Sequence, residues 1–121
     1  MVLAKVYLYQ SKFEKAAPKF EKISKKYQNE LTKELQSQIF NSLGMCYFNL
    51  NDLELSTHYY LKSIEINNNC TATLNNLARI YEKKKLFCEA KNIYLRVLAI
   101  NPKNYIARKN LTRLNSRDSR I

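Results

Sequence analysis

The chain contains 121 residues with a formal net charge of +11; 45% of the residues are hydrophobic, one is glycine and two are proline. This length suits a single domain with a hydrophobic core of its own, and the scarcity of glycine and proline favours an all-helical protein. No stretch approaches the roughly 18 apolar residues that cross a membrane, and the opening MVLAKVYLYQSK is too polar for a secretory signal. We therefore expect a soluble chain.

The first predicted elements are two helices within residues 1–30. Pro18 lies inside the second helix, expected at 12–27, so we expect that helix to kink or to start late. In NELTKELQSQIF the apolar residues recur every four positions, and the next helix should begin near Glu30 with Asn29 as its N-cap. Compared with the later repeats of the chain, described below, the first repeat begins at its fifth position, directly at Met1. This favours the interpretation that the chain is a fragment of a longer protein.

A second helix pair occupies the middle of the chain. In FNSLGMCYFNL the apolar residues recur at i, i+3, i+7 and i+10, which predicts an amphipathic helix. A second apolar face begins at Leu53, and Asn51 and Asp52 supply the turn and the N-cap between the two helices. Beyond a third pair, YIARKNLTRLNSR predicts a closing helix with Ile106 and Leu111 directed inward and a basic outer face.

The middle of the chain matches the residues 34 positions later, and it also matches the residues 40 positions earlier. The pattern L-[GA]-x-x-Y occurs three times, and its second position is Ala4, Gly44 and Ala78. A glycine inside a helix costs about 1 kcal/mol relative to alanine. Because the equivalent residues are both alanine, we expect Gly44 to lie where the two helices of a pair approach most closely.

This pattern resembles the tetratricopeptide repeat, a 34-residue helix pair with the motif L-G-x-x-Y. The middle repeat matches that family at Phe40, Leu43, Gly44, Tyr47, Ser56, Tyr60 and Ser63, and the third at Leu74, Leu77, Ala78, Tyr81, Ala90, Tyr94 and Pro102. The departures are Asn68 in place of a proline, Ser63 and Val97 in place of alanine, and six extra residues between the first two repeats.

The resemblance implies an all-α fold, a right-handed α-solenoid of three tandem helix-turn-helix repeats with a C-terminal capping helix. We expect one tetratricopeptide-repeat domain over residues 1–121. Its repeats should cover about 1–30, 37–70 and 71–104, and its capping helix about 105–117.

Cysteine and histidine usage argues against metal sites and disulfides. Cys46, Cys70 and Cys88 include no CxxC pair, and His58 is the single histidine. We expect no metal and no cofactor, a surface histidine, and three buried free thiols in a reducing intracellular compartment.

No catalytic constellation is present, so the sequence predicts a non-enzymatic protein. There is no glycine-rich phosphate loop, and no nucleophile is placed near His58. The glutamates are expected at helix surfaces, paired with lysines at i,i+4. They are Glu14, Glu21, Glu54, Glu82 and Glu89.

If the resemblance holds, the first helix of each repeat lines a concave groove that binds a peptide. The groove positions that lie outside the apolar stripe are expected to be exposed. They are Lys5, Tyr9, Asn41, Ser42, Met45, Asn49, Asn75, Asn76, Arg79, Lys83, Lys109, Asn110 and Arg113.

The chemistry of this set favours an extended or acidic protein segment as the partner. Asparagine amides can bind a peptide backbone, and the basic residues favour carboxylates. The clamp of the family members that hold chaperone C-termini is absent, because the matching positions are Met1, Lys5, Ser42, Ala72 and Asn76.

LAKVYLYQSKFEKA and LNNLARIYEKK are similar to the plastid and cyanobacterial tetratricopeptide proteins that help assemble photosystem I. That resemblance implies an assembly factor in the plastid, in the stroma or at the thylakoid. It also implies an upstream membrane anchor and partners among photosystem I subunits or their assembly factors.

The uneven charge leaves other functions open. Residues 1–36 have a net charge of +4 and residues 37–78 of −2, whereas residues 79–121 have a net charge of +9. The alternative function is RNA binding through this basic third. Self-association through the first repeat and a basic face that only keeps the chain soluble are further alternatives.

Overall fold

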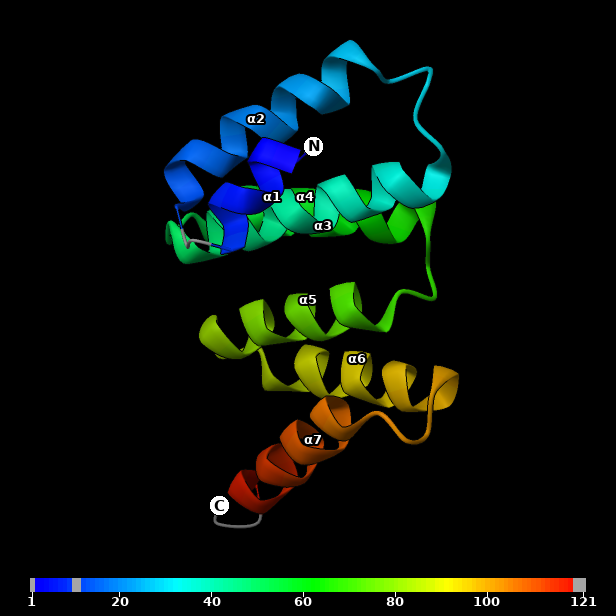
Figure 1. Cartoon of the computed structure of the whole chain (residues 1–121). Coiled ribbons are helices and arrows are strands. Elements are labelled where there is room, and N and C mark those ends of the chain that lie inside the picture. The colour runs from blue at the N-terminus through cyan, green and yellow to red at the C-terminus, as the bar shows by residue number, and fades with distance from the viewer. Residues whose placement is uncertain (1, 10–11, 119–121) are drawn as a thin grey trace. The chain divides into compact units, whose positions relative to one another are not determined.

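The computed structural model describes residues 2–9 and 12–118, and within these ranges the regular structure is helical throughout (Figure 1), which confirms the all-α fold class. The helices form two compact units, the first ending at Asn68 and the second starting at Asn69. Unit 1 contains α1 (Val2–Tyr9), α2 (Phe13–Lys26), α3 (Lys33–Asn49) and α4 (Leu53–Ile66), and unit 2 contains α5 (Thr71–Lys83), α6 (Phe87–Ile100) and α7 (Tyr105–Asp118).

In unit 1 each helix packs on its neighbour in the sequence: α1 on α2, α2 on α3, and α3 on α4. The core between the first three helices follows the 3.6-residue period of the sequence. Half-buried aromatic rings, including Tyr47 and Tyr59, pack around this core. Its buried members are Ala4, Ala16, Ala17, Phe20, Ile39, Leu43 and Cys46.

Gly44 lies in α3 directly against α4, as its place in the repeat predicts. A Cβ atom at this position would lie 2.8 Å from Cζ of Tyr60, and Tyr60 is only 2% exposed. The hydroxyl of Ser56 also donates to the carbonyl oxygen of Gly44 at 2.6 Å. The glycine therefore allows a buried ring and a backbone hydrogen bond between the same two helices.

The turns inside the second and third helix pairs have the same geometry. Asn51 and Lys85 occupy equivalent positions and have positive φ angles of 66° and 62°. The amide of Asp52 donates to the carbonyl of Tyr47 at 2.8 Å, a bond typical of a Schellman helix end. Asp52 then caps α4 by accepting from the amide of Leu55 at 3.1 Å, which confirms the predicted turn and N-cap.

The serine that replaces alanine in the middle repeat forms a buried polar contact. The hydroxyl of Ser63 in α4 donates to the carbonyl oxygen of Ser37 in α3 at 2.8 Å. The two hydroxyls lie 2.9 Å apart, and the Ser37 hydroxyl also lies 3.1 Å from the Ser63 carbonyl oxygen. Because both side chains are buried, these bonds satisfy polar groups that would otherwise be unpaired.

One predicted helix start is wrong, and one of two alternatives for another helix is excluded. The third helix begins at Lys33 rather than near Glu30, because the hydroxyl of Thr32 accepts from the amide of Leu35 at 3.2 Å and makes Thr32 the N-cap. The second helix does not start late. It begins at Phe13 and continues through Pro18 to Lys26.

In unit 2, α6 packs against both α5 and α7. The predicted orientation of α7 is wrong for Ile106, which is 52% exposed, whereas Ala107 and Leu114 are buried. Ala107, Leu111 and Leu114 recur at i, i+4 and i+7, so they lie on one face of the helix. Leu111 is half-buried on that face.

The cysteines are free, but only Cys46 is buried as expected. Cys70 is half-buried and Cys88 is exposed, so the expectation of three buried thiols is wrong. His58 is exposed as predicted, and its ring lies edge-on to Tyr59 with the centroids 5.3 Å apart. Among the described residues, no helix is both long enough and apolar enough to cross a membrane.

Candidate peptide-binding surface

The predicted groove residues fall on the two units, with those of α1 and α3 in unit 1 and those of α5 and α7 in unit 2. The strongest local arrangement is in unit 2, where a carboxylate lies among the predicted basic residues. We define the α5/α7 surface as the predicted residues of that unit: Asn75, Asn76, Arg79, Lys83, Lys109, Asn110 and Arg113.

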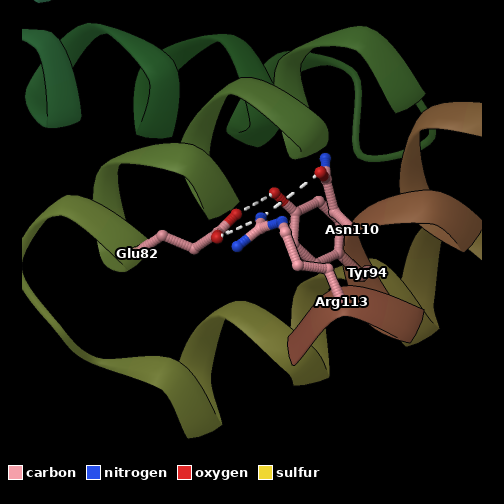
Figure 2. Close-up of polar contacts among 4 residues, drawn as sticks. All are labelled: Glu82, Tyr94, Asn110 and Arg113. Carbon is pink, nitrogen blue, oxygen red and sulfur yellow. Dashed lines mark hydrogen bonds and ion pairs between the residues drawn. The ribbon is translucent and has the colours of Figure 1, made fainter. Parts of the chain in front are cut away.

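Glu82 connects all three helices of unit 2 (Figure 2). One carboxylate oxygen accepts from the hydroxyl of Tyr94 in α6 at 2.5 Å, and the other forms an ion pair with Arg113 in α7. Arg113 also donates to the side-chain oxygen of Asn110 at 3.3 Å. The side chain of Glu82 is 14% exposed and that of Arg113 is 50% exposed, so the ion pair lies at the edge of solvent.

Glu82 also influences the titration of Tyr94. Burial is the largest cause that raises the pKa of the Tyr94 hydroxyl well above its ordinary value, followed by the hydrogen bond to Glu82. The positive charges of Arg113 and Arg79 act in the opposite direction. Tyr94 therefore stays protonated at neutral pH and remains a donor to the carboxylate.

Glu82 does not pair with a lysine at i,i+4, so its predicted role is wrong. Its partners are 12 and 31 residues away in sequence. The repeat gives no indication of this role, because the equivalent residue in the middle repeat is Phe48. In unit 1, Glu21 accepts a hydrogen bond from the hydroxyl of Tyr47, a distant partner that the sequence did not predict.

Asn75 is buried, contrary to the exposure expected from periodicity. It is 4% exposed, and its amide nitrogen donates to the side-chain oxygen of Asn104 at 3.2 Å. That oxygen also accepts from the amide of Ala107 at 3.0 Å, at the start of α7. Since the Asn104 oxygen serves both donors, Asn75 must present its NH₂ group, and within the described chain its own side-chain oxygen has no partner.

The remaining basic residues of the α5/α7 surface are exposed. They are Arg79 and Lys83 on α5 and Lys109 on α7. The Lys109 ammonium lies 6.0 Å from the centroid of the Tyr105 ring, at the limit of a cation–π contact. Together with Arg113, which is paired with Glu82, these residues give the surface four positive charges, so it favours an acidic ligand.

The predicted groove residues of unit 1 carry less charge than those of unit 2. Lys5 and Asn49 are exposed, whereas Asn41, Ser42 and Met45 are half-buried. The Asn49 amide nitrogen donates to the carbonyl oxygen of Met45 at 2.8 Å, which ties this amide to its own helix. The side chain of Tyr9 lies outside the described residues.

Metal chemistry finds no support in the described part of the chain. Across residues 2–9 and 12–118, no three side chains of histidine, cysteine, aspartate or glutamate gather closely enough to hold an ion. Three acidic residues, Glu21, Asp52 and Glu82, instead accept hydrogen bonds from tyrosine, arginine or backbone groups.

Comparison with known proteins identifies the repeats. The sequence profile of the family described as tetratricopeptide repeat matches residues 37–70 and 71–104. A ycf37 protein from Cyanophora paradoxa, described as uncharacterized, is 34% identical over 110 residues, which cover 91% of this chain and 63% of that protein. The chloroplastic tetratricopeptide repeat protein PYG7 from Arabidopsis thaliana is 30% identical over 81 residues, or 67% of this chain and 27% of that protein.

The chain spans only part of these relatives. It covers 63% of the Cyanophora ycf37 protein and 41% of the one from Porphyra purpurea, which is 37% identical over 71 residues. The ycf37 and chloroplastic relatives point to the plastid.

Solved structures show the fold. The first tetratricopeptide domain of Spaghetti (RPAP3), bound to the HSP90 peptide SRMEEVD, has a TM-score of 0.83 at 18% identity, over 96% of this chain and 87% of that chain. The Yersinia enterocolitica chaperone SycD, in complex with a peptide of the translocator YopD, has a TM-score of 0.76 at 18% identity, over 95% and 83%.

Proposed function

Because this chain belongs to the tetratricopeptide repeat family, whose fold serves as a scaffold for protein–protein interaction, we propose that it binds an extended acidic segment of another protein. The α5/α7 surface is the proposed binding surface in unit 2. The observation on which this proposal rests most is the group of exposed basic residues there, of which Arg113 is paired with Glu82.

The half-buried asparagines of this surface, Asn76 and Asn110, support an extended ligand, because a side-chain amide can both donate to and accept from a peptide backbone. Two structural neighbours hold peptides of other proteins, and one of those peptides, SRMEEVD, is acidic. Because the residues of the chaperone clamp are absent here, we propose an acidic partner other than a chaperone C-terminus.

We further propose that the chain acts as a non-enzymatic assembly factor of a multiprotein complex in the plastid, with photosystem I as the complex. Support comes from the ycf37 and chloroplastic relatives and from the sequence resemblance to photosystem I assembly proteins. The stroma or the thylakoid surface would be its place of action, and photosystem I subunits or their assembly factors would be its partners.

An affinity capture from plastid extract tests both proposals. The bait carries Arg79→Glu and Lys109→Glu, and a matched control carries Arg96→Glu and Lys103→Glu, which change the net charge equally elsewhere in unit 2. We expect the variant with Arg79→Glu and Lys109→Glu to capture at least about tenfold less partner protein than wild type. The control variant should capture as much as wild type. Equal capture by both variants would exclude the α5/α7 surface.

The identity of the captured material separates the functions. Photosystem I subunits would support the assembly role, and a reproducible set of unrelated proteins would overturn it while leaving the surface intact. RNA binding predicts that nuclease abolishes capture and that affinity falls steeply with salt, because each neutralised phosphate releases counterions.

A further inference from the structure

Unit 1 contains a cavity of about 240 Å³ between α2, α3 and α4. On α3 its wall includes Phe40 and Leu43. The predicted groove residue Asn41 comes one position after Phe40, and Met45 comes two positions after Leu43. Because successive helical residues are about 100° apart, the cavity opens on a different face of α3 from the predicted groove. We call it the α2–α4 cavity.

The α2–α4 cavity coincides with the departure from the 34-residue repeat. The extra residues form the connection between Lys26 and Lys33, and Gln28 within it lines the cavity. In Figure 1, α2 diverges from α3 towards this connection. The amide nitrogen of Gln36, another lining residue, donates to the carbonyl oxygen of Gln28 at 2.7 Å, so the connection is fixed to α3.

One wall of the cavity is aromatic. The rings of Phe40 and Tyr59 stack with their centroids 6.0 Å apart and their planes at 19°. Tyr59 stacks in turn on Tyr47, at 5.7 Å and 12°. The hydroxyl of Tyr47 donates to Glu21, which holds this row of rings against α2. Such a preorganised wall favours another flat ring over a flexible aliphatic chain.

The charges around the cavity favour an anion beside that ring. Lys25 and Lys62 line it, and the Lys62 ammonium lies 5.3 Å from the centroid of Phe40. Glu21 is the acidic lining residue, and its carboxylate already accepts from Tyr47. A carboxylate at the mouth would therefore meet two ammonium groups and one carboxylate that is already engaged.

We propose that the α2–α4 cavity binds an aromatic side chain of a protein partner, with the carboxylate of an adjacent acidic residue paired to Lys62 or Lys25. Its volume is below the roughly 300–1,000 Å³ of sites for drug-sized molecules and suits a single side chain. Buried aromatic residues commonly dominate such contacts between proteins. This site shares no residue with the α5/α7 surface, so each can fail without the other.

Three capped peptides test the proposal by NMR titration of the ¹⁵N-labelled full chain: acetyl-Phe-Glu-Glu-amide, acetyl-Phe-Lys-Lys-amide and acetyl-Ala-Glu-Glu-amide. We expect the first to bind with a Kd on the order of 1 mM and to shift amide signals around Phe40 and Lys62. The Lys-Lys peptide should bind roughly threefold to tenfold more weakly, and the alanine peptide should give no saturable shift.

Two variants locate the binding. Ser24→Leu fills the cavity from α2 and should weaken the Phe-Glu-Glu peptide about tenfold. Lys62→Glu should remove the preference for Glu-Glu over Lys-Lys. Lys103→Glu, between α6 and α7 and outside both proposed sites, should leave both affinities unchanged, and the thermal midpoint of each variant shows that it is folded.

The proposal is overturned by an absence of shifts up to 10 mM peptide (about ten times the expected Kd) or by equal binding of all three peptides. It is also overturned if binding is lost in Lys103→Glu instead of Ser24→Leu. If free 3-phenylpropionate binds as tightly as the Phe-Glu-Glu peptide, the site recognises a small aromatic acid and the protein partner is excluded.

Discussion

Replacing Gly44 by alanine tests the closest helix contact in unit 1. The change should improve helix propensity by about 1 kcal/mol. The new methyl group would lie within 3 Å of the Tyr60 ring, which is 2% exposed and cannot move away freely. Overpacking of this kind costs about 1–3 kcal/mol. We therefore expect a net loss of about 1 kcal/mol in the free energy of unfolding.

Urea unfolding followed by circular dichroism at 222 nm measures this loss, and a double-variant cycle identifies its cause. In a Tyr60→Leu background the ring is absent, and Gly44→Ala should then be neutral or stabilising. The coupling energy between the two sites should be about 1–3 kcal/mol. The reasoning is refuted if Gly44→Ala stabilises the protein with Tyr60 in place, or if the two changes are additive.

Further changes test the turns, the buried hydroxyls and the buried thiol. Lys85→Gly should raise the free energy of unfolding by about 0.5–1 kcal/mol in urea titrations, because glycine adopts the left-handed conformation without strain. Ser63→Ala should lower the free energy of unfolding by about 1–2 kcal/mol. Ser37→Ala should cost less in the Ser63→Ala background than in the wild-type protein, because the two serines share their hydrogen bonds. Burial, and then the charge of Glu21, raise the pKa of Cys46 from 9.0 to about 11. As the pH rises, the thiol ionises in the unfolded chain before it does so in the folded protein. The contribution of Cys46 to the free energy of unfolding is therefore fully present below pH 9 and falls by roughly 2–3 kcal/mol as the pH rises to 11. Cys46→Ala should remove this fall of the free energy of unfolding between pH 9 and 11, whereas Cys88→Ala, at an exposed site, should not.

Local features were predictable from the sequence because they depend on neighbouring residues and on the repeat. The apolar period predicted helices, and the register of L-[GA]-x-x-Y predicted a close contact at Gly44. Asn51 and Asp52 were predictable as a turn and a cap, since both roles depend on a few adjacent backbone groups. The cap of α3 was missed because Asn29 and Thr32 are both good capping residues, and only the geometry of the connection selects Thr32.

Contacts between distant residues were not predictable, and they determine the candidate sites. The ion pair of Glu82 and Arg113 joins residues 31 positions apart. The repeat does not predict it, because the residue equivalent to Glu82 in the middle repeat is Phe48. Ile106 faces outward because α7 buries the face that carries Ala107 and Leu114, and Ile106 does not lie on that face. The α2–α4 cavity likewise depends on how far an inserted connection separates two helices.

The ion pair also changes which residues should matter most for binding. Arg113 already shares its charge with Glu82, so an acidic ligand would have to compete with a carboxylate attached to the same unit. Removing Arg113 would leave Glu82 only the hydroxyl of Tyr94 among these partners and would loosen α7 from α5. Its loss should therefore affect the stability of unit 2 as well as binding. Arg79, Lys83 and Lys109 are exposed and carry the positive charge that would attract an acidic segment, so charge reversal at these residues tests recognition by this surface.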